Sequence, residues 1–147
     1  TGTPMHADVI PEMLGTIFYE GTPLHDGAMI LRDERIAAAM PSCAFCGYKE
    51  SIGVQYHCSC NYVPGVMRSF DMGDLTGLIA PRPLVIVNGL NDTIFPIDSA
   101  NREFAVAEKL YAAAGAPDKV RHVVGPEGHR FYAALGWPAF DALTGWN

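Results

Sequence analysis

The feature that most constrains the fold is an apolar run at residues 83–88, PLVIVN, which is followed directly by a glycine. A continuous apolar run of this length, bounded by Pro and Gly, is typical of a strand buried inside a parallel sheet. Residues 96–114 then carry a helical apolar face, and residues 120–124 have the pattern of the next strand. This order of strand, helix and strand predicts an α/β layer with a mostly parallel sheet.

Composition limits the classes of protein that remain. The chain has 147 residues, of which 49% are hydrophobic, which suits one folded domain and not a disordered chain. No apolar run approaches the roughly 20 residues that cross a membrane, and no secretion signal follows Thr1. Ten Lys plus Arg against sixteen Asp plus Glu argue against nucleic acid as a partner, because phosphate contacts need clustered cations. We therefore expect a cytoplasmic protein.

Two more strands are predicted before the central run, at residues 27–32 and 35–40, and the others at 83–88 and 119–124. The segment 35–40 has two candidate neighbours. It can run parallel beside 83–88, or it can pair with 27–32 as a hairpin. If it does both, the sheet is mixed, with an antiparallel edge. A helix over residues 130–146 is expected to follow the last strand.

Asp92 and His129 each come just after a predicted strand. In an open parallel sheet, functional residues lie at the carboxyl ends of the strands. A carboxylate at this edge can orient an imidazole and stabilise its protonated form, so that the imidazole acts as a general base near neutral pH. The alternative is structural: Asp92 would be a turn residue, and His129 a surface histidine with ordinary hydrogen bonds. Both interpretations stay open on the residues alone.

About residues 35–147 resemble the C-terminal half of an α/β-hydrolase of the dienelactone-hydrolase and acetylxylan-esterase-like branch. The motifs that carry this resemblance are APRPLVIVNGLND at residues 80–92 and GHRFY at 128–132. The resemblance implies that Asp92 is the catalytic acid and His129 the catalytic histidine, with a small-molecule ester as substrate and no cofactor. The family also has a Gly-x-Ser-x-Gly nucleophile elbow earlier in the chain. No such motif occurs in these 147 residues, so a serine-hydrolase-type fragment that is inactive alone is expected.

Residues 1–39 resemble a different family, the diadenylate cyclases, which make cyclic di-AMP from two ATP. The resemblance is carried by GTPLHDGAMI, in which Asp26, Gly27 and Ala28 match the family's Asp-Gly-Ala motif. It implies that these three residues bind a nucleotide, with ATP and a divalent metal as cofactors. The family's Arg-His-Arg motif is missing. An Asp-Gly pair is also a common turn, so a nucleotide-binding remnant and a plain turn are alternatives.

The two resemblances meet near residues 31–39, so the chain is interpreted as chimeric. We expect a cyclase-like segment at 1–39 and a hydrolase-like part at 40–147, packed as one compact unit. A partial parallel sheet leaves an unpaired edge, which favours association. A non-catalytic or engineered chimeric homo-oligomer, joined through that edge, is therefore a third hypothesis.

Four cysteines fall within eighteen residues, with His57 beside them: Cys43, Cys46, Cys58 and Cys60. Buried thiols are the favoured interpretation, since free cysteine packs as a small apolar residue. Zinc binding is the second, although the Cys-x-Cys spacing is tighter than the usual one. Disulfides are the third, and they would require an oxidising compartment.

Overall fold

The computed structural model describes residues 36–57, 61–62 and 64–146. The predicted strand at 27–32, its hairpin, the motif at 26–28 and two of the cysteines, Cys58 and Cys60, lie outside the described residues. The main elements are β1 (Leu84–Gly89), α4 (Ile97–Ala113), β2 (Val120–Gly125) and α5 (Ala133–Thr144). Shorter helices are η1 (Tyr48–Glu50), η3 (Val66–Arg68), α3 (Met72–Leu75), η4 (Thr76–Leu78) and η5 (Pro117–Lys119).

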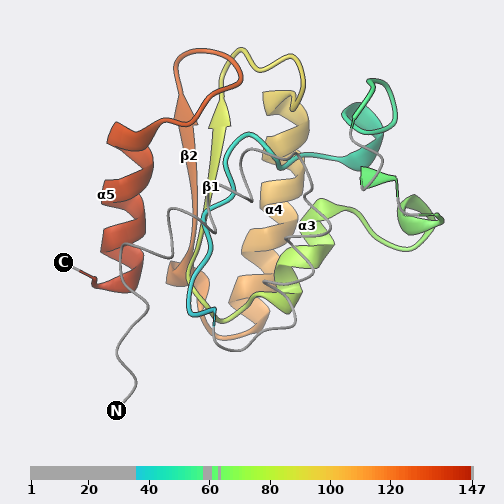
Figure 1. Cartoon of the computed structure of the whole chain (residues 1–147). Coiled ribbons are helices and arrows are strands. Elements are labelled where there is room, and N and C mark those ends of the chain that lie inside the picture. Colours follow the sequence, from blue (N-terminus) through green and yellow to red (C-terminus); the bar gives the residue numbers. More distant parts are fainter. Residues whose placement is uncertain (1–35, 58–60, 63, 147) are drawn as a thin grey trace.

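The sheet is parallel, as predicted. β1 pairs with β2 in a register that runs from Leu84 opposite Val120 to Gly89 opposite Gly125. The connection between them is α4, which packs against the sheet (Figure 1). Among the described residues β2 pairs only with β1, and the prediction of a homo-oligomer through a free edge stays a prediction.

Residues 39–42 lie on the other side of β1 and run parallel to it. Isolated bridges join Ala39 to Leu84 and Ser42 to Val87. The segment therefore takes the parallel place beside β1, although the contact falls a little later in the chain than the predicted strand at 35–40. The ladder is incomplete because Pro41 has no N–H to donate across to β1, while its carbonyl still accepts from Val87 at 2.9 Å.

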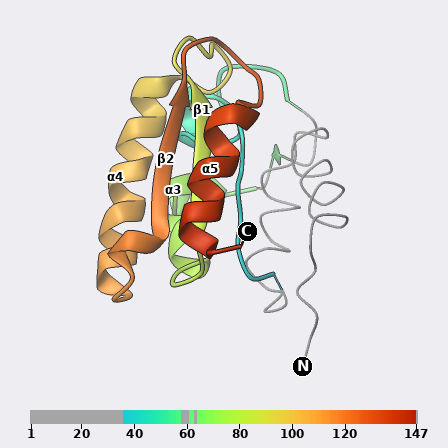
Figure 2. The ribbon, with the colours of Figure 1, turned by 90° about the vertical axis from the view of Figure 1, so that its left-hand side faces the viewer.

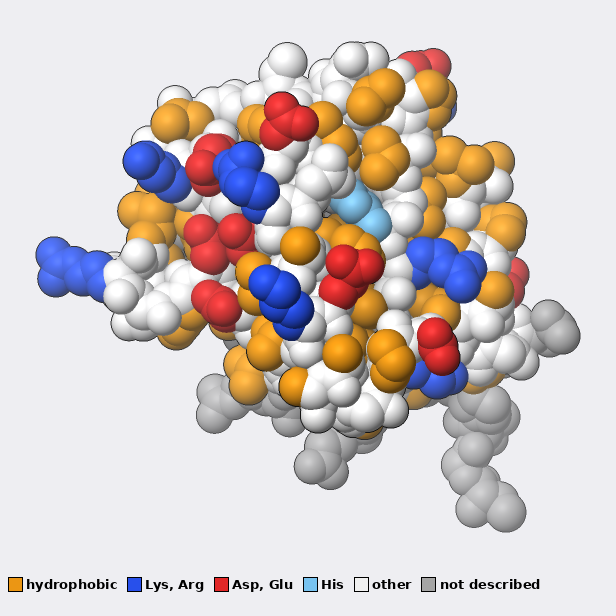
Figure 3. Space-filling view, turned by 180° about the vertical axis from the view of Figure 1, so that it is seen from behind, with side chains coloured by type: hydrophobic (Ala, Val, Ile, Leu, Met, Phe, Trp, Pro, Cys, Tyr) orange, Lys and Arg blue, Asp and Glu red, His pale blue; other side chains and the backbone are white. Residues whose placement is uncertain are grey.

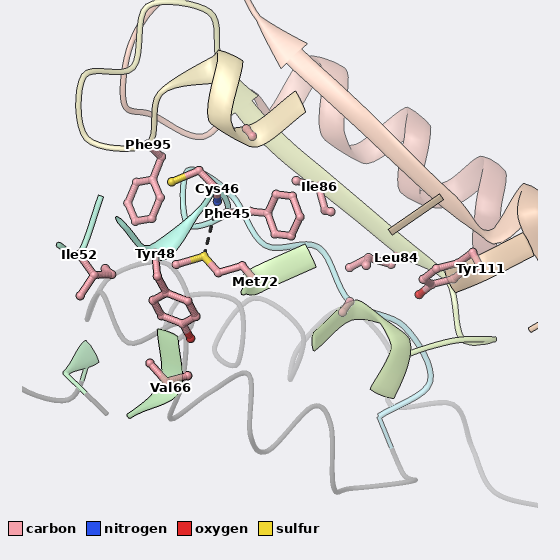
Figure 4. Close-up of a cluster of buried hydrophobic side chains, with 12 residues drawn as sticks. Phe45, Cys46, Tyr48, Ile52, Val66, Met72, Leu84, Ile86, Phe95 and Tyr111 are labelled. Carbon is pink, nitrogen blue, oxygen red and sulfur yellow. Dashed lines mark hydrogen bonds between the residues drawn. The ribbon is translucent and has the colours of Figure 1, made fainter. Parts of the chain in front are cut away.

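The side chains of β1 alternate between two cores, and all six of its residues are buried. Leu84 and Ile86 face the cluster that includes Tyr111 of α4 (Figure 4). Val85 and Val87 face the cluster formed with α5. Helices α4 and α5 thus cover opposite faces of the sheet, as Figure 2 shows. This double burial explains why β1 is a continuous apolar run rather than an alternating one.

The first cluster also holds short segments against the sheet. The backbone N–H of Cys46 points at the sulfur of Met72, 3.5 Å away (Figure 4). Met72 begins α3, whose N-terminus is closed by a reciprocal capping box between Asp71 and Asp74. Tyr48 takes part through its backbone N–H, which donates to the Asp71 carboxylate at 2.7 Å.

Helix α4 matches the prediction for 96–114 within one residue at each end. Ala107 and Tyr111 are 0% exposed on its inner face, and the Tyr111 hydroxyl donates to the carbonyl of Arg82 at 2.8 Å. Gly115, at φ 72°, follows the C-cap and allows the chain to leave the helix. Helix α5 begins later than predicted because residues 126–131 form a loop. In the part of the chain that the structure describes, no helix is long and apolar enough to cross a membrane.

Candidate active site

The loops after β1 and β2 lie side by side at the carboxyl edge of the sheet, at the top of Figure 1. Backbone bonds tie them together: Leu90 N–H donates to Gly125 O at 2.8 Å, and Asn91 N–H donates to Glu127 O at 2.9 Å. The approach is so close that a Cβ at position 89 would collide with the backbone carbonyl of Gly128. Gly89 therefore allows the two loops to come together.

This approach brings Asp92 and His129 into contact. His129 Nδ1 lies 2.9 Å from Asp92 Oδ2. The carboxylate side chain is 0% exposed, whereas the imidazole is 46% exposed. The two residues that the sequence singled out as acid and base are thus neighbours, with one side of the imidazole open to solvent. Their catalytic role remains a prediction.

Backbone donors hold the Asp92 carboxylate in place. Its Oδ1 accepts the N–H of Ile94 at 2.8 Å and that of Phe95 at 3.0 Å. Burial by itself would raise the pKa of Asp92, but the hydrogen bonds from His129, Phe95 and Ile94 outweigh burial and leave the pKa below its ordinary value. The carboxylate is therefore ionised at neutral pH, and Oδ2 is the atom turned toward the imidazole.

The environment of His129 favours its protonated form. The hydrogen bond to Asp92 raises its pKa, against the opposing effect of partial burial. The Phe95 ring stacks on the imidazole with centroids 5.8 Å apart. Since an ionised carboxylate can only accept, Nδ1 carries the proton of the neutral imidazole, and the lone pair lies on Nε2. That is the tautomer a general base needs.

Cys43 is a third member of the site that the sequence did not place there. Its sulfur, a carboxylate oxygen of Asp92 and a ring nitrogen of His129 all lie within 4.8 Å of one another. The thiol points to the carbonyl of Arg130 at 3.2 Å. Burial raises its pKa, and the charge of Asp92 adds to this effect. The available signal was topological, because Cys43 follows the third parallel segment at the same edge of the sheet.

Of the other predicted ligands, Cys46 does not join this group, and Cys58 and Cys60 lie outside the described residues. Cys46 is a free, buried thiol whose sulfur points to the carbonyl of Gly47 at 3.3 Å. Burial raises its pKa to about 12, so it is inert at neutral pH. Of the residues that the structure describes, the group able to hold a metal ion contains Cys43 but not Cys46.

His57 also contacts the Phe95 ring, in an edge-on arrangement with the two ring centroids 5.7 Å apart. Its Nε2 is 3.2 Å from the hydroxyl oxygen of Ser51. This serine–histidine contact does not form a nucleophile, because Ser51 is 0% exposed. Burial lowers the pKa of His57, which keeps the ring neutral.

The fold is of the α/β class, and it is similar to that of esterases of known structure. A glucuronoyl esterase of carbohydrate esterase family 15 from Caldicellulosiruptor kristjansonii superposes with a TM-score of 0.57 at 21% identity, over 76% of this chain and 36% of that one. Methylesterase BT1017 superposes with a TM-score of 0.56 at 22% identity, over 81% of this chain and 28% of that one. Both likenesses show the fold.

Among curated proteins, YtaP of Bacillus subtilis (strain 168), which is named as a hydrolase, is 28% identical over 143 residues. The match covers 95% of this chain and 48% of YtaP, so the chain spans about half the length of that relative. The hydrolase half of the resemblance is thereby confirmed.

The cyclase half is confirmed as well. The family model described as DisA bacterial checkpoint controller nucleotide-binding matches residues 1–52. The cyclic di-AMP synthase CdaA of Bacillus subtilis (strain 168) is 54% identical over 39 residues, which are 26% of this chain and 14% of that protein. The chain therefore has a two-part likeness, to diadenylate cyclases at its N-terminal end and to hydrolases over most of its length.

Proposed function

We propose that the chain carries the acid and the base of a serine-type carboxylic ester hydrolase, acting on acetyl esters or similar small esters, and that this polypeptide alone does not turn over esters. The observation that carries the proposal is the 2.9 Å contact between the buried Asp92 carboxylate and the half-exposed His129 imidazole. The esterase-type fold and the hydrolase relative support it. The acid and base lie at the edge of the sheet where parallel α/β folds keep their sites.

In this role His129 moves a proton at Nε2. Asp92 accepts from Nδ1–H and so fixes the tautomer and orientation of the ring. The Nε2 lone pair takes the proton of an attacking hydroxyl and later returns it to the leaving alcohol. The ionised Asp92 stabilises the imidazolium that exists between the two steps, without taking its proton.

The described serines do not complete the set. Ser42, Ser51 and Ser99 are buried, at 7%, 0% and 2% exposure, so they cannot meet a substrate. The exposed Ser69 follows η3, an element separate from the loops that carry Asp92 and His129. The sequence has no Gly-x-Ser-x-Gly motif in which a serine would stand at an elbow. Without a nucleophile and oxyanion donors, an acid–base pair contributes little to ester cleavage. This is why we expect no turnover from the polypeptide alone.

The inactivity is tested with an activated acetyl ester and a fluorophosphonate probe. We expect no serine labelling, and no turnover above that of an equal concentration of free imidazole. Serine labelling together with turnover that disappears in His129→Ala would show that the polypeptide is an active hydrolase and that the inactivity proposal is wrong.

The acid–base assignment is tested by supplying the missing part. Residues 36–147 can be fused to the portion of YtaP outside the matched 48%. We expect ester turnover in the fusion, reduced about 100-fold or more by either His129→Ala or Asp92→Asn. Asp98→Asn, an exposed carboxylate of α4, is the matched control. If an active fusion keeps its turnover in both site variants, Asp92 and His129 are not its acid and base.

A second function is favoured by the cyclase likeness of residues 1–52. The N-terminal segment would bind ATP with a divalent metal through Asp26, Gly27 and Ala28. We expect millimolar ATP with Mg²⁺ to raise the melting temperature, and Asp26→Ala to abolish the rise while Asp8→Ala keeps it. The absence of any ATP effect in the unmutated chain would dismiss this function.

A further inference from the structure

We propose that Cys43, Asp92 and His129 form a zinc site with water as the fourth ligand. The three side chains come from three separate segments: the end of the parallel run 39–42, the loop after β1 and the loop after β2. Their donor atoms all lie within 4.8 Å of one another. The inference goes beyond the proposed function because it uses Cys43, to which the proposed hydrolase role assigns no step.

The spacing fits a single ion. Zinc binds thiolate sulfur at about 2.3 Å, imidazole nitrogen at about 2.0–2.1 Å and carboxylate oxygen at about 2.0–2.2 Å. Ligands at those lengths lie roughly 3.3–3.8 Å apart around a tetrahedral ion. The 2.9 Å separation of His129 Nδ1 and Asp92 Oδ2 must open slightly, and the sulfur must close in by about 1 Å at most. Side-chain rotation supplies movements of that size.

The charges also fit. A thiolate and a carboxylate carry two negative charges, which balance Zn²⁺ and leave a neutral imidazole as the third ligand. Cys43 and Asp92 are each 5% exposed, so this charge balance matters in a site of low dielectric. On binding, the thiol proton leaves to solvent, the Nδ1 proton moves to Nε2 and the metal takes the vacated positions. Thiolate with imidazole is a donor set that suits zinc.

The surroundings hold the ligands and leave an entry path. Asp92 Oδ1 is occupied by two backbone N–H groups, so Oδ2 is the oxygen that faces the metal position. Cys43 is fixed by its own N–H, which donates to Val87 O at 2.7 Å, and it adopts a φ of 48°, uncommon for a residue other than glycine. The half-exposed His129 lies on the solvent side.

One consequence is that the zinc-bound and general-base states exclude each other. With the metal on Nδ1, the Nε2 atom carries the proton and cannot accept another. A bound zinc ion would therefore silence the acid–base pair rather than assist it.

The proposal is tested on the full chain with Co²⁺, which reports a thiolate ligand by its charge-transfer absorption in the near ultraviolet. We expect this absorption to saturate at one cobalt per chain and to be displaced by Zn²⁺. Cys43→Ser should abolish it and weaken Zn²⁺ binding, measured against a chromophoric chelator, by about 100-fold or more. Cys46→Ser is the matched control, because it changes a buried thiol outside the site and should leave the absorption intact.

His129→Gln gives a second test on an exposed side chain, in case Cys43→Ser disturbs folding, and it should weaken Zn²⁺ binding to a similar degree. The proposal is overturned if the unmutated chain shows no charge-transfer absorption with saturating Co²⁺. It is also overturned if the absorption survives Cys43→Ser and disappears instead in Cys58→Ser or Cys60→Ser. Because no readout uses ester turnover, failure here is distinguishable from failure of the hydrolase proposal.

Discussion

His122 and His129 lie seven residues apart and each has one polar partner within hydrogen-bond distance, yet their electrostatics are opposite. His122 lies within β2, and its Nε2 is 2.9 Å from the amide oxygen of Asn88. Burial lowers its pKa to about 4. His129 lies past the end of β2 against an ionised carboxylate, and its pKa is raised. The charge of the partner and the access to solvent therefore account for the opposite pKa shifts of the two histidines.

The largest expected effect concerns His122. Its folded pKa of about 4 lies below the ordinary 6.5, so the unfolded chain binds the proton more readily. This stabilisation is full above the unfolded pKa and is lost as pH falls from about 6.5 toward 4, by on the order of 3 kcal/mol at the acid end. His122→Gln should flatten that part of the stability profile, measured by urea unfolding across the pH range. An unchanged slope would show that His122 is not buried neutral.

Asp92→Asn should give His129 a neutral amide partner, like the Asn88 partner of His122. Removing the carboxylate charge removes the main cause of the raised pKa of His129, so the pKa should fall, as followed by NMR titration of the imidazole. The stability change should stay below about 1 kcal/mol, because the imidazole is half exposed and an amide oxygen can still accept the backbone donors. Asp98→Asn should leave the titration unmoved.

The same pair defines a pH window. The raised His129 pKa contributes stability that is present below 6.5 and lost as pH rises through its folded pKa. The lowered Asp92 pKa contributes stability that is present above 3.8 and lost as pH falls through its folded pKa. The pair therefore stabilises the fold most between pH 3.8 and 6.5. In the same window the His122 contribution declines as the pH falls. Asp92→Asn should remove both contributions of the pair and leave the loss of stability at low pH that comes from His122.

The smallest effect is expected from Arg130→Ala. Arg130 Nη1 contacts Glu127 at 2.7 Å, but both side chains are more than 60% exposed. Such pairs contribute about 0.5 kcal/mol or less. Neither residue contributes to the raised pKa of His129, so its titration should not move. A clear shift would mean that the loop charges, and not Asp92, separate His129 from His122.

Local sequence patterns predicted the elements whose structure depends mainly on their own residues. The run at 83–88 is apolar throughout because both faces of β1 are covered, and the helix at 96–114 has a clear inner face. The pairing of the segment near 35–40 was harder to predict. Its partner comes more than forty residues later, and Pro41 breaks the ladder that would define its ends.

The candidate site likewise has residues that were easy to place from the sequence and one that was harder. Asp92 and His129 could be predicted to meet because both follow parallel strands. Cys43 was harder to place, since its position depends on residues 39–42 pairing with β1 rather than with the predicted hairpin partner. In the sequence Cys43 lies among other cysteines, whereas in space it lies beside an acid and a histidine.

On the face opposite that of Figure 1, Lys and Arg side chains are interspersed with Asp and Glu (Figure 3). That face offers no continuous basic patch. The exclusion of nucleic acid as a partner stays a prediction.

Asn88 disfavours alternative alignments of β1 with its neighbours. Leu84 to Val87 are so similar that sliding β1 by two residues would keep its inward and outward faces and cost little in apolar contact. The fully buried Asn88 amide, however, donates to Phe45 O at 3.1 Å on one side and accepts from His122 on the other. A slip that moved Asn88 to the position of Ile86, which is 0% exposed, would bury its amide without these partners, at a cost of about 1–3 kcal/mol. One polar side chain therefore distinguishes the native alignment from its nearly degenerate competitors.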